Sequence, residues 1–342
     1  MTLRAKYAVF LPVRNGAAYL REAIDSVISQ TYNDWLLVVL DNASSDGSAE
    51  IALAYGHPRI SVQHSTASLP IWESWHRIWA VLSNGEVGAQ YATIIGHDDV
   101  LLPCFLESID RLINAYPHAG LYQTPFDMID EKGSLIRPCR PIPAIESSMD
   151  FLAARLWGLR DSVGTGYVFR PADYVATGGI PDLPHLLYAD DLLFARLSKG
   201  TFKATTRDSH CLYRLHRGST SYRLTSDRIE GQVAATEQFI ELLNEEFPEF
   251  MRGRAGGSAL ACFLAREIML LRPLARCRLL APVTRKRIQR LEATYARNGT
   301  GIDYRQWLGT NFVSRNFYAH AKQLMLFYVL ARAKAARAFN WN

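Results

Sequence analysis

The stretch "YAVFLPVRNGAAYL", from Tyr7 to Leu20, has the pattern of a strand, a turn and a helix in succession. Its first seven residues form an apolar run without polar alternation, which is typical of a strand buried on both faces. The Arg-Asn-Gly sequence at 14–16 is a turn signal. Apolar residues then recur at helical spacing, at Leu20, Ile24, Val27 and Ile28.

The same pattern repeats downstream. "WLLVVL" (35–40) is a second apolar strand, followed by a polar cluster and a helix that Gly56 closes. We expect a third strand at 60–63, a helix at 70–82, a fourth strand at 91–95, and a helix with Pro103 in its first turn. Apolar strands that alternate with helices predict an α/β fold with a mostly parallel sheet flanked by helices.

From about residue 120 to 225 the pattern becomes mixed, with short strands around a helix at 192–199. This segment is typical of an elaboration of the same sheet. From Arg228 onward the chain has a helical pattern. We therefore expect two domains, an α/β domain at 1–225 and a helical C-terminal region at 226–342.

Charge is distributed unevenly along the 342 residues. The net charge is +5, but the segment from Arg252 to Asn342 carries 17 Lys plus Arg against three acids, a net of +14, which leaves −9 for the rest. The basic segment therefore predicts an anionic partner, either a membrane surface or nucleic acid. Nucleic acid is the weaker choice because the segment shows no recognised reading motif.

The C-terminal segment also has an amphipathic pattern. Leu324, Phe327, Tyr328 and Ala331 can form an apolar stripe flanked by bases, which suits peripheral attachment to a membrane or a packing helix. No apolar run is long enough for a spanning helix. The five cysteines form no CxxC pair, and nothing resembles a secretory signal, so we expect a cytoplasmic protein.

Acidic residues follow apolar runs at three places, where ligands gather in a parallel sheet. Asp41 comes directly after "LLVVL", and its carboxylate can accept hydrogen bonds from a nucleobase or a ribose; the nearby Asp46 can equally be a helix cap. Asp98 and Asp99 follow "YATII". They can begin a helix, where acids favour the dipole, or they can bind Mg²⁺ or Mn²⁺ together with a diphosphate.

Two further sites have weaker signals. Asp190 and Asp191 open a helix, so one can cap it while the other acts as a general base. His216, in "YRLHRGSTS", is either structural or a metal or phosphate contact.

The helical spacing of Trp72, Trp75 and Trp79 favours packing in the core. The first turn has neither GxGxxG nor a P-loop, and no GxSxG hydrolase elbow is present.

In their order along the chain, these pieces resemble the inverting glycosyltransferases of family 2. The resemblance covers roughly residues 5–222 and rests on four stretches: "FLPVRNGAAYLREAIDSVISQTYNDWLLVVLDNASSDGS", "GHDDVLLP", "GGIPDLPHLLYADDLLFARLSKG" and "YRLHRGSTS". It implies the GT-A fold with a nucleotide-binding sheet. Two positions depart from the family pattern: Gly96 stands where the family often has an acid, and Asp190 replaces the customary Glu.

The resemblance implies a role for each candidate residue. The nucleotide-binding residues are Pro12, Val13, Asn15, Asp41 and Asp98; the metal ligands for Mn²⁺ or Mg²⁺ are Asp99 and His216; the catalytic base is Asp191.

The implied activity is transfer of a sugar, with inversion, from a nucleotide-diphosphate sugar to an acceptor hydroxyl of a saccharide or lipid-linked saccharide. We expect it to act in cell-surface polysaccharide or glycolipid synthesis, on the cytoplasmic face of a membrane. One alternative is a sugar nucleotidyltransferase, but that class has a Gly-rich loop and a Lys that are missing after the first strand. The other is a degenerate transferase fold that acts as a membrane-surface binding module, with no role for nucleic acid.

Overall fold

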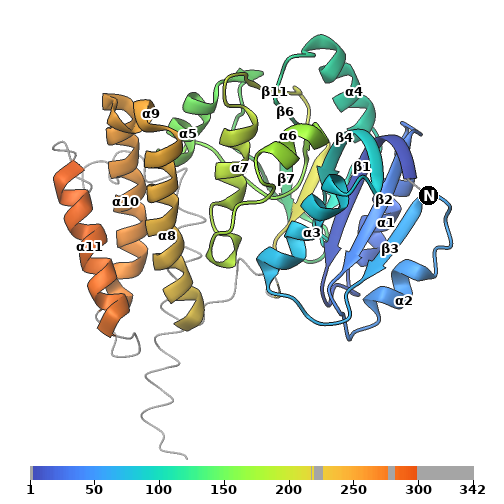
Figure 1. The fold of residues 1–342 in the computed structure, drawn as a ribbon, viewed down its shortest axis with the longest axis horizontal. Coiled ribbons are helices and arrows are strands. Elements are labelled where there is room, and N and C mark those ends of the chain that lie inside the picture. Colours follow the sequence, from blue (N-terminus) through green and yellow to red (C-terminus); the bar gives the residue numbers. More distant parts are fainter. Residues whose placement is uncertain (1–2, 217, 219–225, 276–281, 299–342) are drawn as a thin grey trace, which may run out of the picture. The chain divides into compact units, whose positions relative to one another are not determined.

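The computed structural model describes residues 3–216, 218, 226–275 and 282–298, and the chain forms two compact units, residues 1–219 and residues 220–342. The N-terminal unit contains an eight-stranded sheet with the order β3-β2-β1-β4-β10-β6-β11-β9 (Figure 1). Its first four strands are β1 (Leu3–Val13), β2 (Trp35–Asp41), β3 (Ile60–His64) and β4 (Val87–Ile94), and they are parallel to one another.

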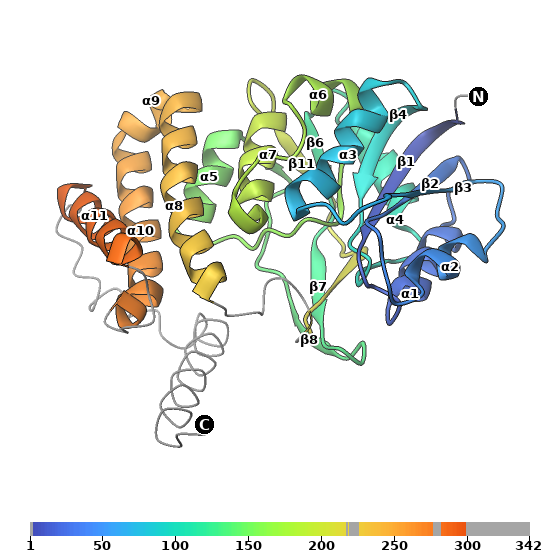
Figure 2. The same ribbon diagram turned by 60° about the horizontal axis from the view of Figure 1, so that its bottom comes forward.

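These parallel strands form the core because their residues are apolar on both faces. All seven residues of β2 are buried, as are the residues of β1 from Tyr7 to Val13. Helices α1 (Leu20–Ile28) and α2 (Ser48–Leu53) pack together, as do α3 (Ile71–Ser83) and α6 (Pro171–Ala176), and the two pairs flank the sheet (Figures 1 and 2). This arrangement confirms the predicted α/β fold.

The other half of the sheet is mixed, so the expectation of a mostly parallel sheet holds for β1 to β4. Strand β10 (Tyr167–Phe169) is antiparallel to β4 and to β6 (Leu121–Gln123). Strand β11 (Lys203–Thr205) is parallel to β6, and β9 (Ile145–Glu146) is antiparallel to β11. Because β10 runs against β4, it begins at the edge where β4 ends.

A second sheet, with the order β5-β12-β7-β8, lies in the same unit. Its strands are β5 (Val100–Leu101), β12 (Cys211–Arg214), β7 (Phe126–Ile129) and β8 (Leu135–Pro138). The remaining helices of this unit are α4 (Phe105–Ala115), α5 (Ser148–Leu156), α7 (Ala189–Leu197) and the short 3₁₀ turn η1 (Pro184–Leu186).

Two local expectations, Pro103 in the first turn of a helix and a cap at Asp190 or Asp191, were wrong, and the alternative of a helix start at Asp98 is excluded. Helix α4 begins at Phe105, so Pro103 precedes it and Asp98 and Asp99 do not begin a helix. Helix α7 begins at Ala189, and among the described residues no side chain caps its N-terminus, so neither Asp190 nor Asp191 is a cap. Their position inside the first turn leaves both carboxylates available for other contacts.

The described residues of the C-terminal unit, 226–275 and 282–298, are helical, as expected. Its helices are α8 (Ser226–Glu246), α9 (Pro248–Arg252), α10 (Arg254–Ala275) and α11 (Pro282–Asn298). Phe239 of α8 packs edge-on against Phe263 of α10, and Arg287 of α11 donates a hydrogen bond to Glu237 of α8 at 2.6 Å. None of the helices within the described residues is both long and apolar enough to cross a membrane. The stripe predicted at 324–331 lies outside the described residues.

Candidate active site

The carboxyl ends of β1, β2 and β4 form the edge that carries most of the predicted site residues. Val13 ends β1 and lies beside Asp41, the last residue of β2. Pro12 and Val13 are both buried in this edge. The hydroxyl of Thr93 on β4 donates to the carbonyl of Tyr167 at the start of β10, at 2.6 Å. In the order β3-β2-β1-β4 the strand order reverses between β1 and β4, and ligands bind at such a point in open α/β sheets.

Asn15 joins the loop after β1 to the loop after β2. Its backbone is left-handed, with φ 52°, a conformation that Asn tolerates better than most residues. Its N–H donates to Ser44 Oγ at 2.9 Å, and its Oδ1 accepts from the N–H of Ser45 at 2.9 Å. Asp46 adds to this connection, because its Oδ2 accepts from the N–H of Ala17 at 2.9 Å. Asn15 thus holds the loop after β1 against the loop after β2.

Asp41 is fully buried, and its two carboxylate oxygens differ. Oδ2 lies 2.5 Å from Nδ1 of His64 and accepts from the N–H of Ser44 at 3.3 Å. Oδ1 is buried and has no hydrogen-bond partner in the described part of the chain. An unsatisfied buried acceptor is costly, so a ligand N–H or O–H that reached Oδ1 would gain a strong bond.

The backbone around Asp41 is held by Arg77 of α3. The two terminal nitrogens of Arg77 donate to the carbonyls of Asp41 and Gln63, both at 2.8 Å. Next to it, Asn42 exchanges hydrogen bonds with Leu69, donating to its carbonyl at 2.9 Å and accepting from its N–H at 2.7 Å. These contacts fix the ends of β2 and β3 and the loop after β3.

Asp98 and Asp99 direct one oxygen each towards Gly96. A Cβ atom placed on Gly96 would lie 2.6 Å from Oδ2 of Asp99 and 2.9 Å from Oδ1 of Asp98. A larger residue at 96 would therefore displace both carboxylates, which gives a physical reason for glycine there. Burial, and then the charge of Asp98, raise the pKa of Asp99 well above its usual range. A divalent cation between the two oxygens would relieve this repulsion.

These two carboxylates fit a cation that also takes oxygens from a substrate. Within the described ranges, no three His, Cys, Asp or Glu residues are grouped so that they could hold a metal by themselves. Nε2 of His216 lies 2.8 Å from Oδ2 of Asp98, the oxygen other than the one near Gly96. In this geometry His216 orients Asp98. A metal here would need further ligands such as diphosphate oxygens.

The sequence reasoning missed Arg214, which organises this part of the site. It ends β12 and is 2% exposed. Its N–H donates to Oδ1 of Asp99 at 2.9 Å, its Nε donates to the carbonyl of Asp98 at 2.8 Å, and its Nη2 donates to Glu22 of α1 at 2.6 Å. The only signal in the sequence was a charged residue at the end of an otherwise apolar short strand.

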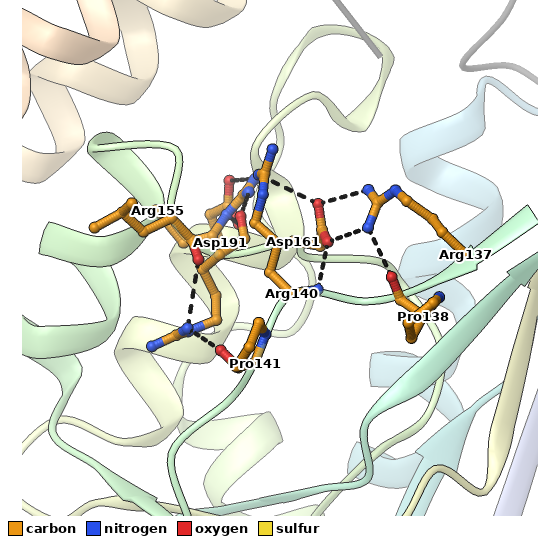
Figure 3. A network of polar contacts seen from close by, with 9 residues as sticks. Arg137, Pro138, Arg140, Pro141, Arg155, Asp161 and Asp191 are labelled. Carbon is orange, nitrogen blue, oxygen red and sulfur yellow. Dashed lines mark hydrogen bonds and ion pairs between the residues drawn. The ribbon is translucent and has the colours of Figure 1, made fainter. Parts of the chain in front are cut away.

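Asp190 and Asp191 lie in the first turn of α7, in different environments. Asp191 is 3% exposed, and its Oδ1 and Oδ2 accept from Nε and Nη2 of Arg155 on α5, at 2.6 and 2.7 Å (Figure 3). Asp190 is half-buried, and burial together with the charge of Asp191 raises its pKa to about 7. Arg155 was also missed, because pairing between two helices leaves no local pattern.

Further ion pairs surround this corner. Arg137 donates to both oxygens of Asp161, at 2.9 and 3.1 Å, and the backbone N–H of Arg140 donates to Asp161 at 2.8 Å (Figure 3). Arg160 donates to Glu146 at 2.6 Å. The segment between β8 and β10 is therefore positioned by arginine–carboxylate contacts, which give directional hydrogen bonds as well as charge.

The tryptophans of α3 are packing residues. Trp72 and Trp79 donate their indole N–H groups to the carbonyls of Ile180 and Val175, both at 3.0 Å, and they stack on either side of His76. Trp75 lies against Gly164. They are half-buried. They thus attach α3 to the segment that leads to α7.

Comparison with known proteins bears on this site. Residues 8–158 match the model of the glycosyl transferase family 2. An uncharacterized glycosyltransferase of Rickettsia felis is 32% identical over 139 residues, which cover 39% of this chain and 22% of the relative. A relative from Bacillus subtilis, the putative glycosyltransferase EpsE, is 27% identical over 146 residues, which cover 41% of this chain and 51% of EpsE. The chain thus matches between about a fifth and a half of the length of these curated relatives.

Two solved structures have a similar fold. TarS residues 1–349 from S. aureus, in complex with UDP-GlcNAc, align with a TM-score of 0.52 and 16% identity over 86% of this chain and 89% of TarS. The mannosyltransferase PcManGT from Pyrobaculum calidifontis, in complex with GDP-Man and Mn²⁺, aligns with a TM-score of 0.51 and 18% identity over 94% of this chain and 87% of PcManGT. Residues 8–158 are thus similar to glycosyl transferase family 2, and the chain shares the GT-A fold of these two solved structures.

Proposed function

We propose that this protein is a metal-dependent glycosyltransferase that moves a sugar from a nucleotide-diphosphate donor to an acceptor hydroxyl with inversion. The observation that carries the proposal is the convergence of Asp98 and Asp99 over Gly96, at the same sheet edge as the unsatisfied carboxylate oxygen of Asp41. This edge offers one group suited to a nucleobase and another suited to a cation with its diphosphate. The family match and the nucleotide sugars bound by TarS and PcManGT support it.

Each residue has a task in this mechanism. Asp41, beside Pro12 and Val13, accepts a hydrogen bond from the donor nucleotide, and Asn15 holds the adjoining loops. Asp98 and Asp99 hold a Mn²⁺ or Mg²⁺ ion, and Arg214 and His216 orient these two carboxylates. When bound, the cation supplies positive charge that stabilises the departing diphosphate.

The proton of the attacking hydroxyl goes to the acidic pair at the start of α7. Asp191 is the residue that the family motif assigns to this role. Both of its oxygens contact Arg155, so an acceptor hydroxyl would have to compete with Arg155 for one of them. Attack from the face opposite the diphosphate inverts the sugar carbon in a single displacement, and no protein nucleophile is needed.

The acceptor side of the proposal rests on composition. The net charge of +14 from Arg252 to Asn342 supports an acceptor, such as a lipid-linked saccharide, at an anionic membrane surface. Such an acceptor would place the enzyme in cell-surface polysaccharide or glycolipid synthesis, as a peripheral protein on the cytoplasmic face.

Isothermal titration with UDP, dTDP and GDP, each with and without Mn²⁺, tests the donor site. We expect at least one of these nucleotides to bind tightly, and only when Mn²⁺ is present. In Asp99→Ala, Mn²⁺ should no longer increase the nucleotide affinity. The matched control is Asp34→Ala, an exposed acid that precedes β2 at the opposite edge of the sheet. Absence of binding by all three nucleotides, with or without metal, would overturn the proposal.

A further inference from the structure

The carboxylate of Asp41 offers a ligand one oxygen and not two. Oδ2 already contacts Nδ1 of His64 at 2.5 Å and the N–H of Ser44 at 3.3 Å. Oδ1 is buried without a hydrogen-bond partner among the residues that the structure places. The nearby guanidinium of Arg77 is committed to two backbone carbonyls. The local chemistry is therefore that of a single, strong acceptor.

His64 controls the second oxygen. It ends β3, pairs in register with Asp41, and its side chain is 53% exposed while that of Asp41 is fully buried. A ligand approaching from solvent thus meets His64 next to the carboxylate. As long as the imidazole stays on Oδ2, Oδ1 is the oxygen left for a base, and the residues that bury Oδ1 must make room for that base.

Nucleobases differ in how many donors they present to a carboxylate. Uracil and thymine present one N–H, at N3. Guanine presents two parallel N–H groups, at N1 and at the exocyclic N2, and needs both oxygens of a carboxylate to satisfy them. Adenine and cytosine place a ring acceptor beside their amino group, and this acceptor would face the negative carboxylate. Because an unpaired donor at a desolvated contact costs binding energy, a single acceptor discriminates among these bases.

We propose that the donor nucleotide of this protein carries uracil or thymine, and that His64 excludes guanine by occupying the second oxygen of Asp41. The inference rests on the proposed function, since it concerns the base of the same donor. The fold by itself leaves the base open, because TarS was solved with UDP-GlcNAc and PcManGT with GDP-Man.

The test is titration of the full chain in Mn²⁺ with UDP, dTDP, GDP, ADP and CDP. We expect UDP or dTDP to bind at least tenfold more tightly than the other three. In His64→Ala the second oxygen of Asp41 becomes available to guanine. The ratio of the affinity for UDP or dTDP to the affinity for GDP should therefore fall at least threefold. The control is His118→Ala, which removes an exposed imidazole and should leave the preference unchanged.

The outcomes separate the inference from the proposed function. GDP binding as tightly as UDP and dTDP, or an unchanged preference in His64→Ala, would overturn the inference while leaving a donor site. Failure of all five nucleotides would overturn the proposed function itself. Asp41→Asn, checked for folding by circular dichroism, should lose UDP or dTDP binding at least tenfold, and retained binding would also contradict the inference.

Discussion

At the scale of single residues, the adjacent side chains of Asp190 and Asp191 on α7 are chemically identical but have different contacts. Both oxygens of Asp191 accept hydrogen bonds from Arg155. Burial and the negative charge of Asp191 raise the pKa of Asp190, and a backbone hydrogen bond and the charge of Arg155 offset only part of this rise. A carboxyl group whose pKa is raised by burial beside another acid is typical of sites that move protons.

The raised pKa of Asp190 predicts how stability depends on pH. In the unfolded chain the group loses its proton near pH 3.8, and in the folded chain near pH 7. Between these values the folded state binds more protons, so this group lowers the stability as pH rises from about 4 to 7. Asp190→Asn removes the penalty, and its free energy of unfolding should exceed that of the wild type by about 1–2 kcal/mol at pH 8, a figure reduced for partial exposure.

Urea unfolding followed by circular dichroism between pH 4 and pH 8 measures this difference. The gain from Asp190→Asn should fall towards zero as the pH approaches 4, because the unfolded state then binds nearly as many protons as the folded state. Asp34→Asn, at an exposed position, serves as the control and should show no such trend. A gain that is the same at every pH would contradict the assignment of the titration to Asp190.

At the scale of elements, the site depends on the close approach of two loops. A Cβ atom on Gly16, in the loop after β1, would collide with the imidazole of His97, in the loop after β4, and would lie 2.8 Å from Cγ2 of Val13. Glycine at 16 therefore lets the nucleotide side of the site pack against the loop of Asp98 and Asp99. Gly16 and His97 are 81 residues apart in sequence, so this approach is visible only in the folded chain.

Gly16→Ala should separate these loops. We expect a loss of about 1–3 kcal/mol in stability, as for overpacking in a core, and at least a tenfold weaker metal-dependent nucleotide affinity. Gly257→Ala is the control, because nothing lies within 4 Å of the added Cβ and alanine favours the helix. Calorimetry and thermal unfolding of both variants decide the matter, and unchanged nucleotide affinity in Gly16→Ala would refute the coupling of the loops.

The elements also explain which features the sequence could predict. Strands such as β2 are continuous apolar runs, and their position and parallel order follow from a local pattern. Strand β4 begins at Val87, four residues before the predicted start, because it pairs there with the N-terminal half of β1. The two-residue strands β5 and β9 have too few residues to form a pattern.

The same distinction applies to the site. Asp41, Asp98 and Asp99 could be proposed because they follow apolar strands directly. Arg155 and Arg214 contact acids that are 36 and 115 residues away in sequence, so only the folded chain shows their partners. The stretch that contains His216 was recognised, but its role beside Asp98 depends on β12 lying against β5.

At the scale of the whole molecule, two tasks are proposed for two parts of the chain. The proposed donor site lies entirely within the unit of residues 1–219. The basic charge is concentrated after residue 252, and residues 299–342 carry six Lys or Arg against one acid. If the C-terminal region meets a membrane while the N-terminal domain binds the donor, the two activities should be separable.

Deletion of residues 299–342 tests this separation. Each Lys or Arg near an anionic surface contributes about 1 kcal/mol, so loss of six should weaken binding to phosphatidylglycerol vesicles at least a hundredfold. The affinity of the truncated chain for nucleotide and Mn²⁺ should stay unchanged, which also serves as the control for folding. Phosphatidylcholine vesicles should bind neither chain, because they lack the negative charge. If both chains bind the anionic vesicles equally, the membrane contact belongs to the basic helices α10 and α11. If neither chain binds, the proposed membrane contact is excluded.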